Sequence, residues 1–377
     1  MNVLTLQQQL VDYAAQIGVD KIGFTTAAPF VDLKQKLKRQ QQLNYQSGFE
    51  ESNIELRTVP TLLLEEAESI IAIAIAYPSR MEDAPSGKKG ERRGIFCRAS
   101  WGTDYHTVLR EKLRLIEAFL EEKVPGVKMR SMVDTGELSD RAVAERAGIG
   151  WSGKNCSIIT PEFGSYVYLG EMITNIPFEP DEQMEDQCGE CRLCIDVCPT
   201  GAIVQAGQLN SHKCVAFQTQ TKGFLPDEFR EKIGNRIYGC DTCQTVCPKN
   251  KGKKNWLHEA FKPEPELAKP LLKPLLQISN KEFKTQFGYM SGSWRGKKPI
   301  QRNAIIALAH FKEVDAMPEL VELLRKDERP MIRGTAAWAI GKIGAEEAES
   351  VLLQAQQVEQ DEEVLKEIEK GLMFIES

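Results

Sequence analysis

The sequence has no long hydrophobic run, which sets a first limit on the class of protein. Its longest apolar segment is residues 70–77 (IIAIAIAY), far shorter than the about 20 residues that a helix needs to span a bilayer. Residues 1–10 (MNVLTLQQQL) carry no basic stretch followed by an apolar one, so they do not resemble a secretion signal. We therefore expect a cytoplasmic protein without a membrane anchor.

A strong positive charge is also missing. The 377 residues contain 48 Lys and Arg against 54 Asp and Glu, a formal net charge of −6. This excludes a protein that is basic over its whole surface, although a local basic patch is enough to bind nucleic acid. A chain of this length predicts two or three domains rather than one core.

Histidine is scarce, with four residues, whereas cysteine is frequent, with ten. Eight of the ten cysteines fall between Cys188 and Cys247. Disulfide scaffolds are typical of small secreted domains. Clustered cysteines in a long chain without a secretion signal therefore indicate metal ligands.

The spacing of these cysteines is that of proteins with two 4Fe–4S clusters. A compact run of four ends in Cys198-Pro199, and in such runs the fourth cysteine ligates the other cluster. A second, irregular set ends in Cys247-Pro248 and needs Cys214 to complete it. This logic assigns Cys188, Cys191, Cys194 and Cys247 to the first cluster, and Cys198, Cys214, Cys240 and Cys243 to the second.

Two structural zinc sites are the alternative, because Cys-x2-Cys pairs also bind zinc. The sequence has no Cys-x3-Cys-x2-Cys triplet, the usual loop of radical S-adenosylmethionine enzymes. Both clusters are therefore expected to be fully ligated and to carry electrons. Another group must then perform the chemistry.

Residues 1–178 mix helical and strand patterns, which predicts an α/β domain. Helices are expected where apolar residues recur every three or four positions, and strands where short apolar runs are bounded by turn residues. The run 70–77 is typical of a strand buried on both faces. The expected helices are 6–17, 105–122 and 140–147, and the expected strands are 70–77, 131–134, 157–160 and 166–173, with a glycine-containing loop at 148–153.

The C-terminal part repeats with a period of 31 residues, since 299–304 (PIQRNA) recurs as 330–335 (PMIRGT). An alanine-rich helix follows each start, at 304–310 and 336–343, and second helices are expected at 317–324 and 348–357. Paired helices at this period predict HEAT-like repeats. The expected domains are 1–178 (α/β), 179–256 (a small α+β ferredoxin-like domain with two clusters), 257–298 (linker and helices) and 299–377 (all-α HEAT-like repeats).

Together with the ferredoxin-type run, three motifs resemble epoxyqueuosine reductase: Asp134-Thr135-Gly136, Asp140-Arg141 and residues 150–155 (GWSGKN). The repeat tail fits the longer form of that family. The resemblance implies reduction of epoxyqueuosine to queuosine at the wobble position of tRNA, the last step of queuosine biosynthesis. It also implies base-off cobalamin in residues 1–178, reduced through the two clusters.

Three residues in or near the implied cobalamin site are candidates for its chemistry. Asp134 is the expected catalytic residue and cofactor contact, a partly buried carboxyl whose raised pKa would let it supply protons. Its alternative is an Asx turn that accepts the amides of Gly136 or Glu137. Arg57 is expected at a corrin amide, or else in a surface ion pair. Cys97, within 92–100 (RRGIFCRAS), is expected against the corrinoid, or else as a small buried side chain.

Transfer RNA is the expected partner, with its phosphates on basic residues near the cluster segment and the repeat start. Binding of this kind releases counterions, so it weakens steeply with salt, and the modified base must leave its stack. Arg141 is a further phosphate contact, or else part of a solvated helix face. The expected tRNA-binding residues are Arg141, Lys249, Lys251, Lys253, Lys254, Arg295, Lys297 and Lys298.

An external low-potential electron donor is also expected, and the chain is expected to be a monomer. Two other functions fit parts of the sequence. A corrinoid-dependent reductase of a small molecule would leave the repeat tail and basic residues without a purpose. A non-catalytic two-cluster electron carrier would leave the domain of residues 1–178 unexplained.

Overall fold

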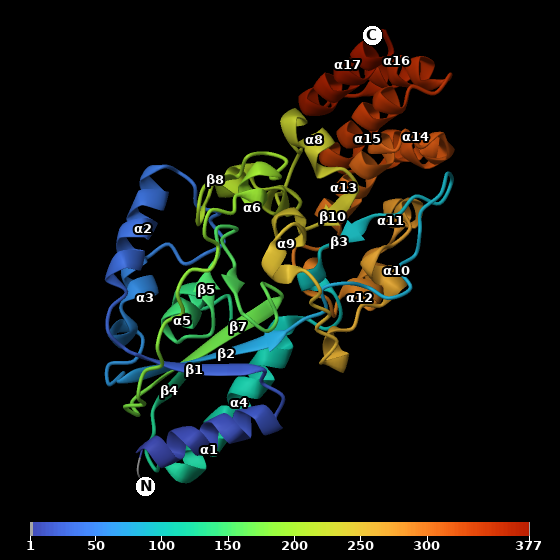
Figure 1. The fold of residues 1–377 in the computed structure, drawn as a ribbon. Helices are drawn as coiled ribbons and strands as arrows, with labels where there is room; N and C mark the ends of the chain where they lie inside the picture. The colour runs from blue at the N-terminus through green and yellow to red at the C-terminus, as the bar shows by residue number, and fades with distance from the viewer. Residues whose placement is uncertain (1–2, 377) are drawn as a thin grey trace. The chain divides into compact units, whose positions relative to one another are not determined.

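The structure, a computed structural model, describes residues 3–376 and divides them into two compact units (Figure 1). Both units are discontinuous in sequence, whereas the domains expected from the sequence are continuous. Unit 1 comprises 1–80, 103–214 and 241–262, and unit 2 comprises 81–102, 215–240 and 263–377.

Unit 1 is built on a four-stranded sheet with the order β1 (Lys21–Thr26), β2 (Ser69–Ala76), β7 (Val167–Thr174) and β4 (Met129–Met132). Every residue of β2 is buried. Helices α1 (Val3–Gln16) and α4 (Tyr105–Lys123) cover one face, and α5 (Asp140–Arg146) covers the other (Figure 1).

All ladders of this sheet are antiparallel, which corrects the expected α/β class: the unit is α+β. The buried strand at 70–77 and the helix at 105–122 are confirmed. The strand expected at 131–134 is instead Met129–Met132, so Asp134 lies beyond it. The expected loop at 148–153 contains the strand β5 (Trp151–Ser152), which pairs with β6 (Ile158–Ile159).

The remaining elements of unit 1 are short and surround the cysteine-rich segment and the sheet edges. They are α2 (Val31–Gln42), α3 (Ile54–Thr58), η1 (Pro60–Leu62), α6 (Leu193–Asp196), β8 (Ile203–Gln205), β9 (Gln208–Leu209), η3 (Ser211–Lys213), α9 (Thr242–Thr245), η4 (Pro248–Asn250) and η5 (Glu259–Phe261).

Unit 2 contains the helical repeats, which confirms the HEAT-like expectation and adds a fifth long helix at the C-terminal end. The repeat helices are α13 (Lys297–His310), α14 (Met317–Lys326), α15 (Pro330–Ile343), α16 (Ala348–Val358) and α17 (Glu362–Glu376). Preceding them are β3 (Ile95–Phe96), η2 (Arg98–Ser100), α7 (Val215–Gln218), α8 (Asp227–Ile233), β10 (Arg236–Tyr238), α10 (Pro265–Ala268), α11 (Leu272–Gln277), α12 (Asn280–Phe287) and η6 (Ser291–Ser293), and η7 (Val314–Ala316) joins α13 to α14.

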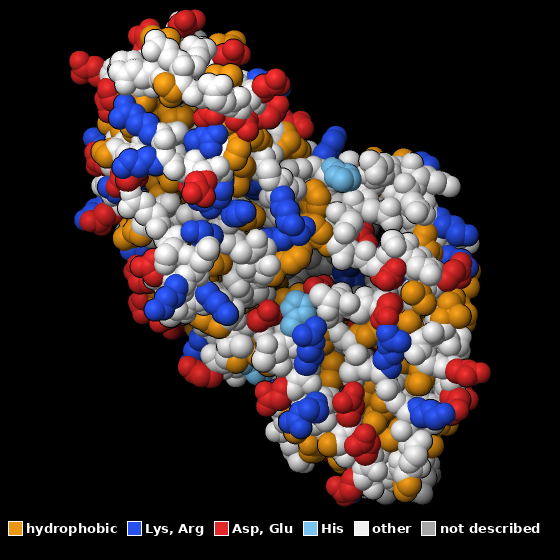
Figure 2. All heavy atoms as spheres, turned by 180° about the vertical axis from the view of Figure 1, so that it is seen from behind, with side chains coloured by type: hydrophobic (Ala, Val, Ile, Leu, Met, Phe, Trp, Pro, Cys, Tyr) orange, Lys and Arg blue, Asp and Glu red, His pale blue; other side chains and the backbone are white. Residues whose placement is uncertain are grey.

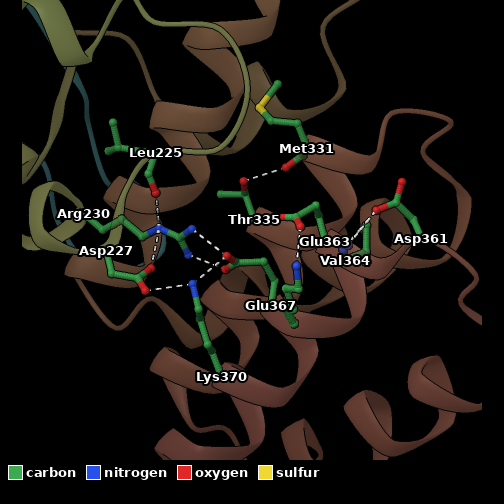
Figure 3. Close-up of polar contacts among 11 residues, drawn as sticks. Leu225, Asp227, Arg230, Met331, Thr335, Asp361, Glu363, Val364, Glu367 and Lys370 are labelled. Carbon is green, nitrogen blue, oxygen red and sulfur yellow. Dashed lines mark hydrogen bonds and ion pairs between the residues drawn. The ribbon is translucent and has the colours of Figure 1, made fainter.

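One buried ion pair joins α8 to the last repeat helix (Figure 3). Both guanidinium Nη atoms of Arg230 donate to the Glu367 carboxylate, at 2.5 and 2.9 Å, and the side chains are 2% and 6% exposed. Lys370 and Asp227 complete the cluster at its rim. The segment that precedes the repeats is thus fixed to the end of the repeat array.

A second buried arginine begins the array. Arg302 of α13 is fully buried, and its guanidinium donates to the backbone carbonyls of Gln218, Thr221 and Gly223. This basic residue at a repeat start therefore holds the chain of unit 2 together. Among residues 3–376, no helix is both long and apolar enough to cross a membrane.

Candidate active site and cluster-binding segment

Asp134 lies in the loop after β4, in a left-handed backbone conformation with φ of 53°. Aspartate is one of the few residues that adopt this region readily. Its amide donates to Oδ2 of Asp140, the first residue of α5, at 2.7 Å. Its own carboxylate accepts the Tyr105 hydroxyl at 2.8 Å, rather than the Gly136 or Glu137 amide that an Asx turn would use.

His106 is the second partner of the Asp134 carboxylate. Nε2 of His106 lies 3.4 Å from Oδ2 of Asp134, an ion-pair distance without the alignment of a hydrogen bond. On the other side of the ring, Nδ1 lies 2.8 Å from Oδ1 of Asp104, which also caps α4. The imidazole is therefore held between two carboxylates.

This arrangement reverses the expected titration of Asp134. His106 first, and then Tyr105, hold the pKa of Asp134 below its ordinary value, against the opposing effect of burial. Burial lowers the pKa of His106, but Asp104 and Asp134 outweigh it and raise this pKa to about 9. The prediction of a raised pKa for Asp134 is wrong, because the sequence does not show that these donors face it.

A cavity of about 1000 Å³ opens beside this loop. Asp134 is among its lining residues, and its side chain is 59% exposed. The other lining residues come from residues 48–52, from the α4 positions 110–117 and from 130–137.

The structure brings Arg57 and Arg141 to the same region of unit 1. Burial lowers the pKa of Arg57. The charge of Arg141 adds to this effect, whereas those of Glu50 and Asp140 oppose it. Arg141 donates to the backbone carbonyl of Cys156 and lies close enough to Asp134 to favour its ionised form. Cys97 lies in unit 2, where its amide donates to the Tyr238 carbonyl at 2.9 Å.

Two further carboxyl groups lie close to the Asp134 loop. Burial, and then the Asp134 carboxylate, raises the pKa of Asp140 to about 6. Glu171 of β7 is fully buried, and neither of its carboxyl oxygens has a hydrogen-bond partner. Burial first, and then Asp140 and Asp134, raise the pKa of Glu171 well above its ordinary value. Burial and the neighbouring carboxyls therefore favour the protonated form of Glu171.

The two cysteine runs fold alike, although the second is irregular as a sequence motif. Each contains one short helix, α6 or α9, that is capped by a valine with nearly equal backbone angles (φ −84° and ψ −10° at Val197, φ −85° and ψ −10° at Val246). A cysteine and then a proline follow each valine, as Cys198-Pro199 and Cys247-Pro248. The two runs therefore form the same type of turn.

The structure brings together the four thiols of the first expected set, Cys188, Cys191, Cys194 and Cys247. Burial raises the pKa of Cys194 and of Cys247, and in both cases Cys188 and Cys191 are close enough to add to the effect. Cys156, whose pKa burial raises to about 11, has Cys194, Cys214 and Cys198 as neighbours.

At Cys198, burial raises the pKa of the thiol, but amide donors outweigh it and lower this pKa. The Ala202 amide, for example, donates to Sγ at 3.2 Å. Such donors favour the thiolate that binds iron. None of the ten cysteines is in a disulfide, and among the residues described no three His, Cys, Asp or Glu side chains converge on one metal ion.

The expected tRNA-binding residues divide between the units and between roles. Lys251 and Lys254 are exposed in unit 1, and Lys298 is exposed in unit 2. Others are engaged within their own unit: Lys249 lies over the Trp151 ring at 5.6 Å, Lys253 donates to the Pro161 carbonyl at 2.6 Å, Lys297 donates to the Ile278 carbonyl at 2.8 Å and Arg295 lies over the Trp294 ring at 4.2 Å. Figure 2 shows acidic side chains at the C-terminal end of unit 2, with Lys and Arg side chains next to them along the same unit.

Two buried donors near Arg141 suit a large polar cofactor. Trp151 Nε1 and Asn155 Nδ2 are buried without a partner, and both belong to the motif GWSGKN. A corrinoid carries a fringe of amide groups, whose carbonyls would satisfy such donors. The cavity beside Asp134 is large and polar, which fits a corrinoid, and the two donors lie outside its lining residues.

Four residues of this site are missing from the expectations: Asp104, Tyr105, His106 and Glu171. Tyr105 and His106 begin a predicted helix and Asp104 directly precedes it, so the helical pattern gave no sign of a site. Glu171 interrupts the apolar pattern of a predicted buried strand (VYLGEMIT), and a charged residue at such a position was the signal that could have found it.

These features match those of known protein families. Residues 57–135 match the family described as epoxyqueuosine reductase QueG, DUF1730, residues 187–250 match the 4Fe-4S double cluster binding domain, and residues 296–373 match HEAT repeats. The chain is 67% identical over 377 residues to the epoxyqueuosine reductase of Bacillus subtilis (strain 168), covering 100% of this chain and 98% of the relative. It is 30% identical over 374 residues to that of Escherichia coli (strain K12), covering 99% and 98%.

Solved structures agree over the full length. A crystal structure of epoxyqueuosine reductase with a tRNA-Tyr epoxyqueuosine-modified tRNA stem loop is similar with a TM-score of 0.98 at 66% identity, covering 100% of both chains. A structure of the Bacillus subtilis enzyme with its Asp134 catalytic loop swung out of the active site has a TM-score of 0.97 at 66% identity, covering 99% of this chain and 100% of that one.

Cluster segment and repeats together define an iron–sulfur oxidoreductase with a HEAT-repeat tail. More narrowly, the chain belongs to the epoxyqueuosine reductase family.

Proposed function

We propose that this protein reduces epoxyqueuosine to queuosine at the wobble position of tRNA. The observation that carries the proposal is the full-length similarity to an epoxyqueuosine reductase bound to an epoxyqueuosine-modified tRNA stem loop. The conversion of an epoxide to an alkene takes up two electrons and two protons, and the oxygen leaves as water. The protein must therefore supply electrons and protons, and it must bind tRNA.

The protein's own residues have distinct parts in this reaction. Asp134 is the catalytic residue, placed at the mouth of a cavity where its carboxyl can pass protons to the leaving oxygen. Arg57, Trp151 and Asn155 of unit 1 would hold base-off cobalamin. Bound cobalamin would supply a strongly reducing cobalt centre, which the two clusters keep reduced.

The eight clustered cysteines are proposed to ligate the clusters in the two sets given above, and an external low-potential donor would reduce them. Arg141 and the exposed lysines Lys251, Lys254 and Lys298 are proposed phosphate contacts. We further propose that the protein works as a monomer in the cytoplasm, where its tRNA substrate is found.

Nucleoside mass spectrometry tests the function directly. Transfer RNA that carries epoxyqueuosine is incubated without oxygen with the cluster-loaded protein, cobalamin and a strong reductant. Conversion to queuosine that stops when cobalamin is omitted is the expected result. No conversion by protein that holds both clusters would contradict the proposal.

A further inference from the structure

The side chains around Asp134 pose a problem for its role as a proton donor. Two groups, the Tyr105 hydroxyl and the His106 imidazole, approach the same oxygen, Oδ2, at 2.8 and 3.4 Å. Donors that converge on a carboxylate favour its ionised form. At rest Asp134 therefore has no proton of its own to give.

The groups around His106 favour a protonated imidazole in a fixed orientation. Asp104 accepts the Nδ1–H of the ring at 2.8 Å and also accepts the His106 backbone amide at 3.0 Å, so the ring cannot turn without breaking a hydrogen bond. The Tyr105 ring stacks on it with centroids 4.2 Å apart. With Nδ1 fixed as a donor, Nε2 is the ring nitrogen that lies 3.4 Å from Oδ2 of Asp134, and the side chain is only 19% exposed.

We propose that His106 stores the proton that Asp134 delivers to the leaving oxygen. The inference rests on the proposed function and adds a residue to it. In the step, the Nε2–H bond of His106 breaks as an O–H bond forms on Oδ2 of Asp134. The Asp134 O–H bond then breaks as the proton passes to the substrate oxygen, and the electrons come from the clusters. Neutral His106 regains a proton from solvent, and the cycle repeats for the second proton.

His106 acts through Asp134, so it is a positioning residue. The titratable and charged groups around this pair come from four elements. Asp104, Tyr105 and Arg110 belong to α4 and its cap, Asp134 to the loop after β4, Asp140 and Arg141 to α5, and Glu171 to β7. Burial opposes the charge on His106, but Asp104 and Asp134 outweigh it, which keeps His106 protonated through neutral pH.

Nitrogen NMR on the full-length, cluster-loaded protein with ¹⁵N-labelled histidine tests this without substrate. The chain has four histidines, and His106→Gln assigns the signal. We expect His106 to titrate near pH 9 in the wild type. In Asp134→Asn its midpoint should be at least one pH unit lower, a tenfold larger acid dissociation constant. Titration at or below pH 6.5 would overturn the proposal.

Single-turnover rates of queuosine formation, measured against pH, supply the second test. His106→Gln should lower the rate by about 10- to 100-fold at pH 7 and move the alkaline limit to lower pH, and Asp104→Asn should move it the same way. His258→Gln is the matched control, because His258 pairs with Asp20 at 2.7 Å elsewhere in unit 1. Its rate should equal that of the wild type.

The two possible failures are distinguishable. Wild-type protein that forms no queuosine contradicts the proposed function. Normal wild-type turnover with the same rate and pH limit in a folded His106→Gln variant contradicts only the role of His106. Cluster absorbance and thermal melting show whether each variant is folded.

Discussion

Around the Asp134 loop, individual side chains are arranged for charge rather than for stability. Glu171 shows this best, since a buried carboxyl without a partner costs about 1–3 kcal/mol of folding free energy. An apolar residue would pack at the same position of β7 without that penalty. The chain keeps an acid there, close enough to Asp140 and Asp134 for their charges to act on it.

Glu171 should make folding stability depend on pH. Its pKa is raised in the folded protein, so the folded chain keeps a proton that the unfolded chain releases above its ordinary pKa of 4.5. Stability therefore falls as pH rises above that value, by at most about 1.4 kcal/mol per pH unit. Urea unfolding at several pH values should show Glu171→Gln equal to the wild type at low pH and more stable at pH 7. The exposed Glu65→Gln is the control, and parallel curves for wild type and Glu171→Gln would refute the prediction.

Asp134 itself can be tested without disturbing its backbone. Asparagine, like aspartate, tolerates the left-handed region, so Asp134→Asn should keep the loop but lose proton transfer. We expect queuosine formation to fall by about 10²–10⁴-fold with unchanged tRNA affinity by filter binding. Asp83→Asn changes another left-handed aspartate, with φ of 49°, and should retain full activity. A tenfold loss of tRNA affinity in Asp134→Asn would instead indicate a binding role.

Asp134 could be proposed as a catalytic residue from sequence, through its motif and its place after a strand. The direction of its pKa shift could not, because Tyr105 and His106 come from a helix 29 and 28 positions earlier. Only the antiparallel pairing of β4 with β7, and the packing of α4 on that sheet, bring these side chains together. A periodic sequence pattern predicts an element and which of its faces is buried. It does not predict which other element packs against that face.

At the scale of elements, the duplicated cysteine turns predict which ligands belong together. If Cys188 and Cys247 share a cluster, the double variant Cys188→Ser/Cys247→Ser should lose about four iron atoms, no more than either single variant. Cys243→Ser/Cys247→Ser should lose about eight, because its two changes strike different clusters. Iron analysis after anaerobic reconstitution measures both. Cys156→Ser should retain full iron, and equal losses in the two double variants would rule out the pairing.

The α8–α17 ion pair gives a second prediction at this scale. Removal of one partner leaves an uncompensated buried charge, so Glu367→Ala should lower the free energy of unfolding by about 3–5 kcal/mol. Its exposed counterpart is the Lys342–Glu231 pair at 2.9 Å, and Glu231→Ala should change stability by less than about 1 kcal/mol. Urea unfolding of the full chain compares the two, and similar small effects would show that Arg230 finds another partner.

At the scale of the whole molecule, the largest departure from the sequence-based prediction is discontinuity. Residues 81–102 belong to unit 2 because β3 pairs in parallel with β10, about 140 positions later. Strands of two or three residues leave no periodic signal, and each is recognised only by its partner. The repeats, by contrast, could be predicted because each helix packs on its neighbours in the chain, so that the pattern and the packing are both local.

Both units carry exposed lysines that are proposed to contact tRNA phosphates. The salt dependence of tRNA affinity measures how many of them do so. Removal of one lysine that binds a phosphate should reduce the slope of log affinity against log salt by about 0.7–0.9. Filter binding over a salt series should show this reduction for Lys298→Ala, and about twice as much for Lys251→Ala/Lys254→Ala. Lys366→Ala, in the acidic C-terminal helix, should leave the slope unchanged. An unchanged slope in the double variant would confine tRNA binding to unit 2, whereas an unchanged slope in all three would refute the basic surface.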